Sequence, residues 1–177
     1  MNNLHLGAGN VYIAGWTNVD LFSNVQSDVY SSVLSLPFDR ESFDLIYACH
    51  VLEHLNRHLI LSALTHWRDL LKPGGTLRLS VPNFQRICEH YTRYKNIKEI
   101  TGLLYGGQKF HLDCHNIAFD YETLVDYLRM VGFTEYPKIW DWKETEHSQY
   151  DDYSQAYLPH RDKENGMLMS LNVQVKK

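Results

Sequence analysis

Residues 4–10 read LHLGAGN, an apolar run that ends in two glycines around an alanine. The next apolar run, residues 16–21, follows after a short link and contains Asp20 near its end. In a parallel sheet, ligands collect at the carboxyl ends of the strands, where glycine lets a ligand approach the backbone closely. The Asp20 carboxylate can accept both hydroxyls of a ribose. The two runs therefore predict a nucleoside site, although a tight turn and a surface aspartate would explain the same residues.

The glycine turn does not fit a dinucleotide. A dinucleotide fingerprint has three glycines, and its helix N-terminus faces the pyrophosphate. Residues 10–14 contain no third glycine and leave no room for a helix. We therefore expect a ligand without phosphate groups, and a nicotinamide dehydrogenase is disfavoured.

Along the rest of the chain, strand and helix patterns alternate, which predicts an α/β fold with a mainly parallel sheet covered on both faces. Asn83 and Asp120 are expected to cap the second and third helices, and Gly132 to end the third. The last two strands are expected to form an antiparallel edge. Strands are predicted at residues 4–6, 16–21, 43–48, 76–83, 136–142 and 169–175, and helices at 59–71, 84–95 and 120–131.

Two segments have no clear period. Residues 96–119 contain YGGQKFHLDCHN and are expected to form an insertion over one edge of the core. Residues 143–166 are polar and rich in tyrosine, and they are too long for a plain hairpin. Loops of that length are usually lids or disordered, so both segments are candidates to cover a site.

The composition predicts a single domain, residues 1–177, in a reducing cytoplasm. Its net charge of −4, from 17 basic and 21 acidic residues, offers no broad cationic surface for nucleic acid. Three widely spaced cysteines without a signal peptide make a disulfide framework improbable. Since no apolar run is long enough to cross a bilayer, we expect neither a membrane nor a nucleic acid as partner.

Four motifs in order resemble those of class I S-adenosylmethionine-dependent methyltransferases, in particular the small type 11 subgroup. They are LHLGAGN, NVDL, SLPFDRESFDLIYACHVLEHL and LLKPGGTLRLSVPN, and they cover residues 4–83. Each motif alone is weak, but the ordered set is specific. The resemblance implies a Rossmann-like three-layer sandwich around a seven-stranded sheet with an antiparallel C-terminal strand, and S-adenosyl-L-methionine as cofactor.

The resemblance also implies a set of cofactor contacts. The glycine turn would meet the methionine portion, Asp20 the ribose, and the segment after residue 31 the adenine, while the end of the strand FDLIYAC would face the sulfonium. The cofactor-binding residues implied are Gly7, Ala8, Gly9, Asp20, Ser32, Val33, Leu36, Cys49, His50 and His54.

Two departures from the family pattern affect this site. Ser32 stands where many relatives have an acidic residue, so backbone carbonyls would recognise the adenine amino group. The helix between the first two strands is missing, as are residues before the first strand that could cap the pocket. We therefore expect an exposed cofactor that is closed by residues 96–119, by residues 143–166, or by the second subunit of a homodimer.

Methyl transfer to a hydroxyl needs a positioned nucleophile and a group that accepts its proton. Of the ten histidines, His115 and His50 are the candidate catalytic bases, and His54 is expected to be structural. His111, Gln108 and Asn83 are candidate substrate-binding residues, although capping alone explains Asn83. For any single histidine, a structural role is the simpler interpretation.

The sequence HLDCH, residues 111–115, has three groups that can bind zinc but no fourth ligand at a matching spacing, so no metal is predicted. Tyr105, Tyr150, Tyr153 and Tyr157 are candidates for a stacking wall, and packing against the sheet edge explains them equally well. The sequence thus predicts a methyltransferase that acts on a hydroxyl of a small molecule or carbohydrate. The alternative is a catalytically inactive cofactor-binding module of the same fold.

Overall fold

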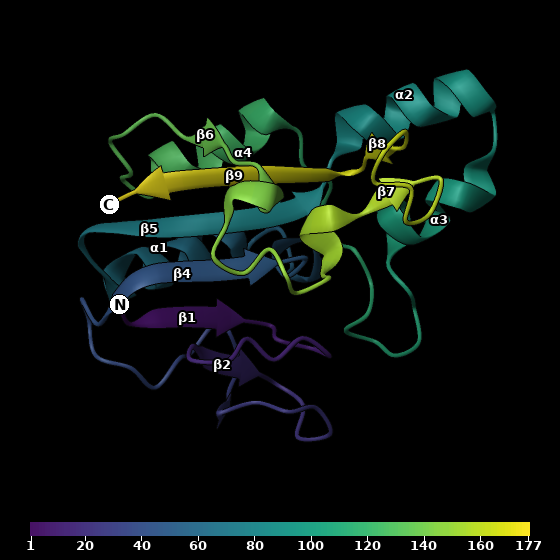
Figure 1. Cartoon of the computed structure of the whole chain (residues 1–177). Helices are drawn as coiled ribbons and strands as arrows, with labels where there is room; N and C mark the ends of the chain where they lie inside the picture. Colours follow the sequence, from purple (N-terminus) through teal and green to yellow (C-terminus); the bar gives the residue numbers. More distant parts are fainter.

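The computed structural model describes all residues, 1–177, and its centre is a seven-stranded sheet with the order β3-β2-β1-β4-β5-β9-β6 (Figure 1). The strands are β1 (Asn3–Leu6), β2 (Thr17–Asp20), β3 (Val29–Tyr30), β4 (Phe43–Cys49), β5 (Leu71–Pro82), β6 (Lys138–Ile139) and β9 (Ser170–Lys176), and a separate hairpin pairs β7 (Tyr157–Leu158) with β8 (Met167–Leu168). The helices are α1 (Ile60–Leu70), α2 (Phe84–Tyr94), α3 (Ile97–Tyr105) and α4 (Tyr121–Met130), with short 3-10 turns η1 (Leu52–His54), η2 (Trp142–Glu144) and η3 (Tyr153–Gln155).

The sheet confirms the predicted Rossmann-like topology. Strands β3, β2, β1, β4 and β5 pair in parallel, and β9 lies antiparallel between β5 and β6. No helix joins β1 to β2, which confirms the expected departure from the usual pattern. The two-residue β3 was not predicted, because two residues show no alternation.

One face of the sheet holds the main core, and α1 and α4 cover it. The amphipathic pattern of α1 buries five residues, and β1, β4, β5 and β9 supply the apolar side chains opposite them. Asp120 caps α4 by accepting a hydrogen bond from the Thr123 N–H, and Gly132 follows the helix with a φ of +93°, both as predicted.

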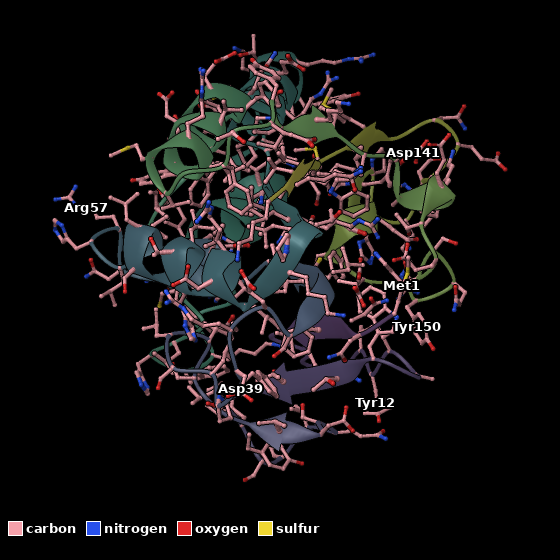
Figure 2. All side chains as sticks on the ribbon, turned by 90° about the vertical axis from the view of Figure 1, so that its left-hand side faces the viewer. Met1, Tyr12, Asp39, Arg57, Asp141 and Tyr150 are labelled. Atoms are coloured by element: carbon pink, nitrogen blue, oxygen red, sulfur yellow. The ribbon has the colours of Figure 1, made fainter.

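The second face is covered by η2, η3 and the segments around them rather than by α-helices. A smaller cluster there joins Ile13, Tyr47, Cys49 and Trp140. Figure 2 shows this arrangement from the side: Arg57, shortly before α1, lies on one side of the sheet, and Asp141 and Tyr150 lie on the other. The expected three layers are therefore present, but the third layer is irregular.

The segments at the carboxyl ends of the parallel strands differ in part from the sequence-based expectation. Residues 96–119 contain helix α3, which was missed, and residues 143–166 contain η3 and strand β7. Figure 1 shows α2, α3 and the β7–β8 hairpin gathered at the end of the sheet toward which β1 and β4 point. None of the helices has the length and apolar character needed to cross a membrane.

Candidate active site

A cavity of about 910 Å³ lies at the carboxyl ends of β1 and β4. Its walls come from four parts of the chain: the glycine turn, the end of β4 with η1, residues 99–115, and residues 151–169. The two segments without a clear period in the sequence thus line the same cavity as the glycine turn.

The glycine turn needs its glycines for different reasons. Gly7 has a φ of +64°, and a Cβ there would lie 2.5 Å from Cγ2 of Val51, so a side chain is excluded both by conformation and by space. Gly9 has a φ of +53°, but its Cβ would have only the Gly7 carbonyl oxygen, at 3.9 Å, as a neighbour. Gly9 therefore leaves free space on the cavity wall, whereas Gly7 is needed because Val51 packs directly against it.

Asp20 is buried at the end of β2 and is fixed by the turn before it. Its Oδ2 accepts a hydrogen bond from the Gly9 N–H at 2.8 Å, and its Oδ1 accepts one from the Phe22 N–H at 2.9 Å. Each carboxylate oxygen has a second lone pair. The carboxylate can therefore hold the turn in place and still accept hydrogen bonds from a ligand.

The residues expected at the adenine lie beside the cavity rather than on its wall. Ser32 Oγ accepts from the Leu34 N–H at 3.2 Å, and the Val33 carbonyl accepts from Nε1 of Trp67 at 2.8 Å. The Leu36 side chain is buried in the main core, and its N–H donates to His66. The Leu36 side chain therefore packs in the core and does not face the cavity. The sequence around Pro37 gives no sign of which of these two positions Leu36 takes.

Cys49 ends β4, His50 follows it, and both line the cavity. Burial raises the pKa of the Cys49 thiol well above its usual value, so the thiol is neutral and is not a nucleophile. His50 has a φ of +53°, an uncommon conformation for a residue other than glycine, which aims its ring at buried partners.

Both ring nitrogens of His50 are engaged. Nε2 lies 3.0 Å from Ser170 Oγ, and because that hydroxyl donates to the Tyr153 carbonyl, the histidine Nε2–H is the donor. Nδ1 lies 3.1 Å from Oε1 of Glu53, which is completely buried. Burial acts to raise the pKa of Glu53, but the electrostatic influence of the nearby His50 acts against it and the pKa is lowered. Glu53 is therefore a buried, ionised carboxylate that lies against His50.

His54 and His115 lie edge to face, with ring centroids 4.8 Å apart, and both line the cavity. Nδ1 of His54 lies 3.0 Å from the Leu112 carbonyl oxygen, and Nδ1 of His115 lies 2.9 Å from that of Leu103. A carbonyl only accepts, so each Nδ1 is a donor and each Nε2 of a neutral ring carries a free lone pair. Burial lowers the pKa of His115, which favours that neutral form.

The three residues expected to bind substrate do not lie on this cavity. His111 and Gln108 are exposed on the loop between α3 and α4. Asn83 caps α2 by accepting from the Arg86 N–H at 3.3 Å, and it borders a separate hollow of about 250 Å³. The structure therefore shows Asn83 as a helix cap. Gln108 reaches the cavity lining only through its backbone N–H, which donates to the Asp113 carbonyl at 2.8 Å.

Comparisons with known proteins agree with this geometry. Residues 5–79, somewhat less than half of the chain, match the family model described as Methyltransferase domain. Over these residues the chain is similar to a methyltransferase domain. Among curated proteins, none matches it significantly.

Solved structures of methyltransferases share the fold of this chain over 99% of its length. A possible histamine N-methyltransferase from Thermotoga maritima is 16% identical with a TM-score of 0.65, over 99% of this chain and 82% of that one. A methyltransferase from Methanosarcina mazei is 16% identical with a TM-score of 0.62, over 99% and 92%. The 1,6-didemethyltoxoflavin-N1-methyltransferase of Burkholderia thailandensis, solved with S-adenosylhomocysteine and 1,6-didemethyltoxoflavin, is 17% identical with a TM-score of 0.58, over 99% and 70%.

The glycine turn fits S-adenosylmethionine, the cofactor of the proteins that this chain resembles. Gly7, Ala8 and Gly9 line the cavity, the space beyond Gly9 is free, and the Asp20 carboxylate stands next to it. Cys49, His50 and His54 complete the same wall. A side chain at position 9 would fill the part of the cavity next to the glycine turn.

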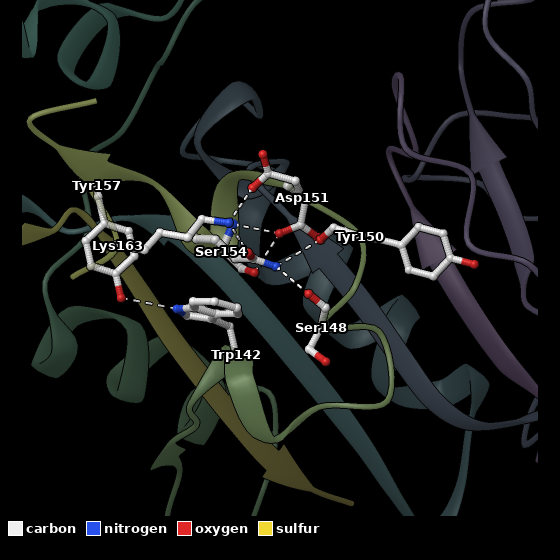
Figure 3. Close-up of polar contacts among 9 residues, drawn as sticks. Trp142, Ser148, Tyr150, Asp151, Ser154, Tyr157 and Lys163 are labelled. Atoms are coloured by element: carbon white, nitrogen blue, oxygen red, sulfur yellow. Dashed lines mark hydrogen bonds and ion pairs between the residues drawn. The ribbon is translucent and has the colours of Figure 1, made fainter. Parts of the chain in front are cut away.

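The sequence predicted the cavity wall formed by residues 151–169 only as a segment, not residue by residue. Lys163 holds it together: its Nζ lies 2.9 Å from Asp151 Oδ1 and 2.7 Å from Gln155 Oε1, and 5.0 Å from the centre of the Trp142 ring (Figure 3). Nε1 of Trp142 donates to the hydroxyl of Tyr157 at 3.2 Å. Of the four tyrosines proposed for a stacking wall, Tyr153 and Tyr157 line the cavity, whereas the Tyr150 hydroxyl accepts from the Ala14 N–H.

Proposed function

We propose that this protein transfers the methyl group of S-adenosylmethionine to a hydroxyl of a small molecule or a glycan. The observation that carries the proposal is the free Nε2 of His115, which lies in the same cavity as the glycine turn. Bound S-adenosylmethionine would supply a methyl group already activated by its sulfonium. The protein must then position the acceptor and take its proton.

His115 is the better of the two candidate bases. Its Nδ1–H is held by a backbone carbonyl, its Nε2 is free, and its lowered pKa keeps it neutral. Both ring nitrogens of His50 are already in contact with buried groups, Nδ1 with Glu53 and Nε2 with Ser170. We assign His115 to accept the hydroxyl proton as the oxygen bonds to the methyl carbon and the carbon–sulfur bond breaks, and His50 to a positioning role.

The size and lining of the cavity support a small polar acceptor. At about 910 Å³ the cavity lies near the top of the range of about 300–1,000 Å³ that is usual for ligand pockets. It therefore has room for the cofactor and a small acceptor, and residues 96–119 and 143–166 are proposed to cover both. Tyr153, a residue that is 67% exposed, lines the cavity and offers an aromatic ring on which a sugar can stack.

The proposal is tested with purified protein and a panel of sugars, nucleosides, phenols and amines. Calorimetry should detect binding of S-adenosylmethionine and S-adenosylhomocysteine, and at least one hydroxyl acceptor should release S-adenosylhomocysteine. The variant His115→Ala should lower kcat by about 100- to 10,000-fold with cofactor affinity unchanged. The matched variant His111→Ala, from the same loop, should keep full activity.

Three outcomes would contradict the proposal. If a folded protein binds neither form of the cofactor at millimolar concentration, the assignment is wrong. If it binds the cofactor but turns over no acceptor of a broad panel, it is the inactive cofactor-binding module. If only amines are methylated, the hydroxyl acceptor is wrong and the methyltransferase assignment stands.

A further inference from the structure

Glu53 is a buried carboxylate with too few partners. It is completely buried, and neither of its oxygens has a hydrogen-bond donor. His50 is within ion-pair distance at 3.1 Å, but the contact is not aligned as a hydrogen bond. Buried ionised carboxylates normally accept several hydrogen bonds or bind a metal ion. Glu53 therefore has acceptor capacity that the protein alone does not use.

Two further ligand atoms converge on Glu53. One ligand atom each from Glu53, His54 and His115 lies within 4.8 Å of the other two. In both histidines Nδ1 is bound to a backbone carbonyl, which leaves Nε2 as the free donor atom. Histidines that bind metals are typically oriented in this way by a hydrogen bond from the other ring nitrogen.

Asn116 fixes the two segments that carry these residues. Its backbone N–H donates to the Glu53 carbonyl at 2.7 Å, and its side-chain Nδ2 donates to the His54 carbonyl at 2.8 Å. The loop that carries His115 is thereby held against η1. The three groups are placed by backbone hydrogen bonds rather than by chance contacts of flexible side chains.

We propose that Glu53, His54 and His115 bind one divalent metal ion at the wall of the cavity. Two imidazoles and a carboxylate are a typical ligand set for a transition metal ion with open positions, and they favour Mn²⁺ to Zn²⁺ over Mg²⁺ or Ca²⁺. Ligand atoms about 2.1 Å from one ion lie about 3.4 Å apart in tetrahedral geometry. The three atoms lie within 4.8 Å of one another, so binding an ion requires them to close by up to about 1.4 Å. A carboxylate has two oxygens, so one can stay near His50 while the other binds the ion.

The set differs from the zinc ligands that the sequence offered. In HLDCH only His115 belongs to it, because His111 is exposed and the sulfur of Cys114 is not among the converging atoms. Glu53 and His54 come from η1, which lies far away in the sequence. The sequence-based expectation of no metal considered only ligands close together in the sequence. In the folded chain, Glu53 and His54 come close to His115 and provide further ligands.

An ion here would have a role in the reaction. His54 and His115 line the cavity, so an open coordination position would face the acceptor. A hydroxyl bound to a divalent ion has a lowered pKa, so it can lose its proton without a strong base. This role rests on the proposed function; the binding of the ion does not. With the ion bound, His115 holds the ion, and the proton of the bound hydroxyl passes to solvent water as its oxygen bonds to the methyl carbon and the carbon–sulfur bond breaks. Without the ion, His115 accepts the proton as assigned above.

The site is tested by metal binding to protein without a histidine tag, after chelation and dialysis. Co²⁺, Mn²⁺ and Zn²⁺ are titrated by calorimetry, with the visible absorption of Co²⁺ as a second signal and Mg²⁺ as a comparison. One equivalent should bind and raise the melting temperature. His54→Ala, His115→Ala and Glu53→Gln should each weaken binding at least 10-fold, whereas His111→Ala and Cys114→Ser should leave it unchanged.

The proposal is overturned if none of the three transition ions binds stoichiometrically, or if binding depends on His111 and Cys114. Glu53→Gln changes a buried group and requires a check of folding by circular dichroism; His54 is less buried, and its variant decides the question if Glu53→Gln does not fold. No cofactor or acceptor is needed, so the result is independent of the proposed function. Full methyl transfer in excess chelator would refute the role at the acceptor and leave the binding site intact.

Discussion

Gly7 offers a test of why the turn after β1 requires glycine. A left-handed conformation costs an L-residue about 1–2 kcal/mol, and overpacking a buried site costs about 1–3 kcal/mol more. At Gly7 both penalties apply, because φ is +64° and a Cβ would lie 2.5 Å from Cγ2 of Val51. We therefore expect Gly7→Ala to lower the free energy of unfolding by about 2–5 kcal/mol.

Gly9→Ala is the matched control. Its φ of +53° imposes the conformational cost, but its Cβ would have no neighbour closer than 3.9 Å. We expect a loss of only about 1–2 kcal/mol in stability, together with weaker cofactor binding because the new methyl group projects into the cavity. The two variants thus separate packing from ligand contact.

A double-mutant cycle isolates the contact between Gly7 and Val51. Val51→Ala removes the methyl group that a Cβ at position 7 would strike, and by itself costs about 1.5–3 kcal/mol. The double variant should be more stable than the sum of the single changes predicts, by about 1–3 kcal/mol. Urea unfolding followed by tryptophan fluorescence measures all four proteins. Equal losses for Gly7→Ala and Gly9→Ala, with additive effects in the cycle, would refute the steric explanation.

Three further predictions address single side chains. Burial lowers the pKa of His147 from 6.5 to about 4, so its contribution to stability is complete above about pH 6.5 and is lost as the pH falls toward 4, by about 3 kcal/mol; His147→Phe should flatten this part of the stability profile, and an unchanged acid slope would contradict it. Asp20→Asn turns an amide N–H toward a backbone donor, such as that of Gly9, and should weaken cofactor binding at least tenfold by calorimetry; equal affinity would rule out the carboxylate as a cofactor contact. Asn83→Ala should cost about 1 kcal/mol of unfolding free energy through loss of the α2 cap and leave KM unchanged, and a raised KM would restore Asn83 as a substrate residue.

The elements that the sequence predicted are those whose burial follows a period. In α1 the buried residues recur at helical spacing, and the strands β1, β4 and β9 are nearly all buried. Helix α3 was missed because only Ile100 of its nine residues is buried, so its sequence shows no apolar stripe strong enough to outweigh the glycines around it. Its position depends on contacts with α2 that lie outside any local pattern.

The same distinction holds for the site. Gly7, Gly9 and Asp20 were predictable because a strand end and its turn are local features. The meeting of His54 with His115 was not, since it depends on the two hydrogen bonds that Asn116 makes to η1. The sequence signal that could have identified it is Glu53 beside His54, a carboxylate next to an imidazole directly after a buried strand.

Polar side chains on the second face of the sheet hold the irregular segments that cover this face, where no helix between β1 and β2 is present. Tyr47 donates its hydroxyl hydrogen to Asp152 at 2.7 Å, Asn172 donates to the Ser154 carbonyl at 3.0 Å, and Nε1 of Trp140 donates to the Leu79 carbonyl at 3.1 Å. A helix would satisfy its own backbone and bury an apolar stripe, but an irregular segment brings backbone groups that need partners from the sheet. Asn172 and Ser170 of β9 supply two such partners, because they donate to the Ser154 and Tyr153 carbonyls. Over residues 152–154, the segment expected to be a lid or disordered is thus hydrogen-bonded to the sheet that positions the site.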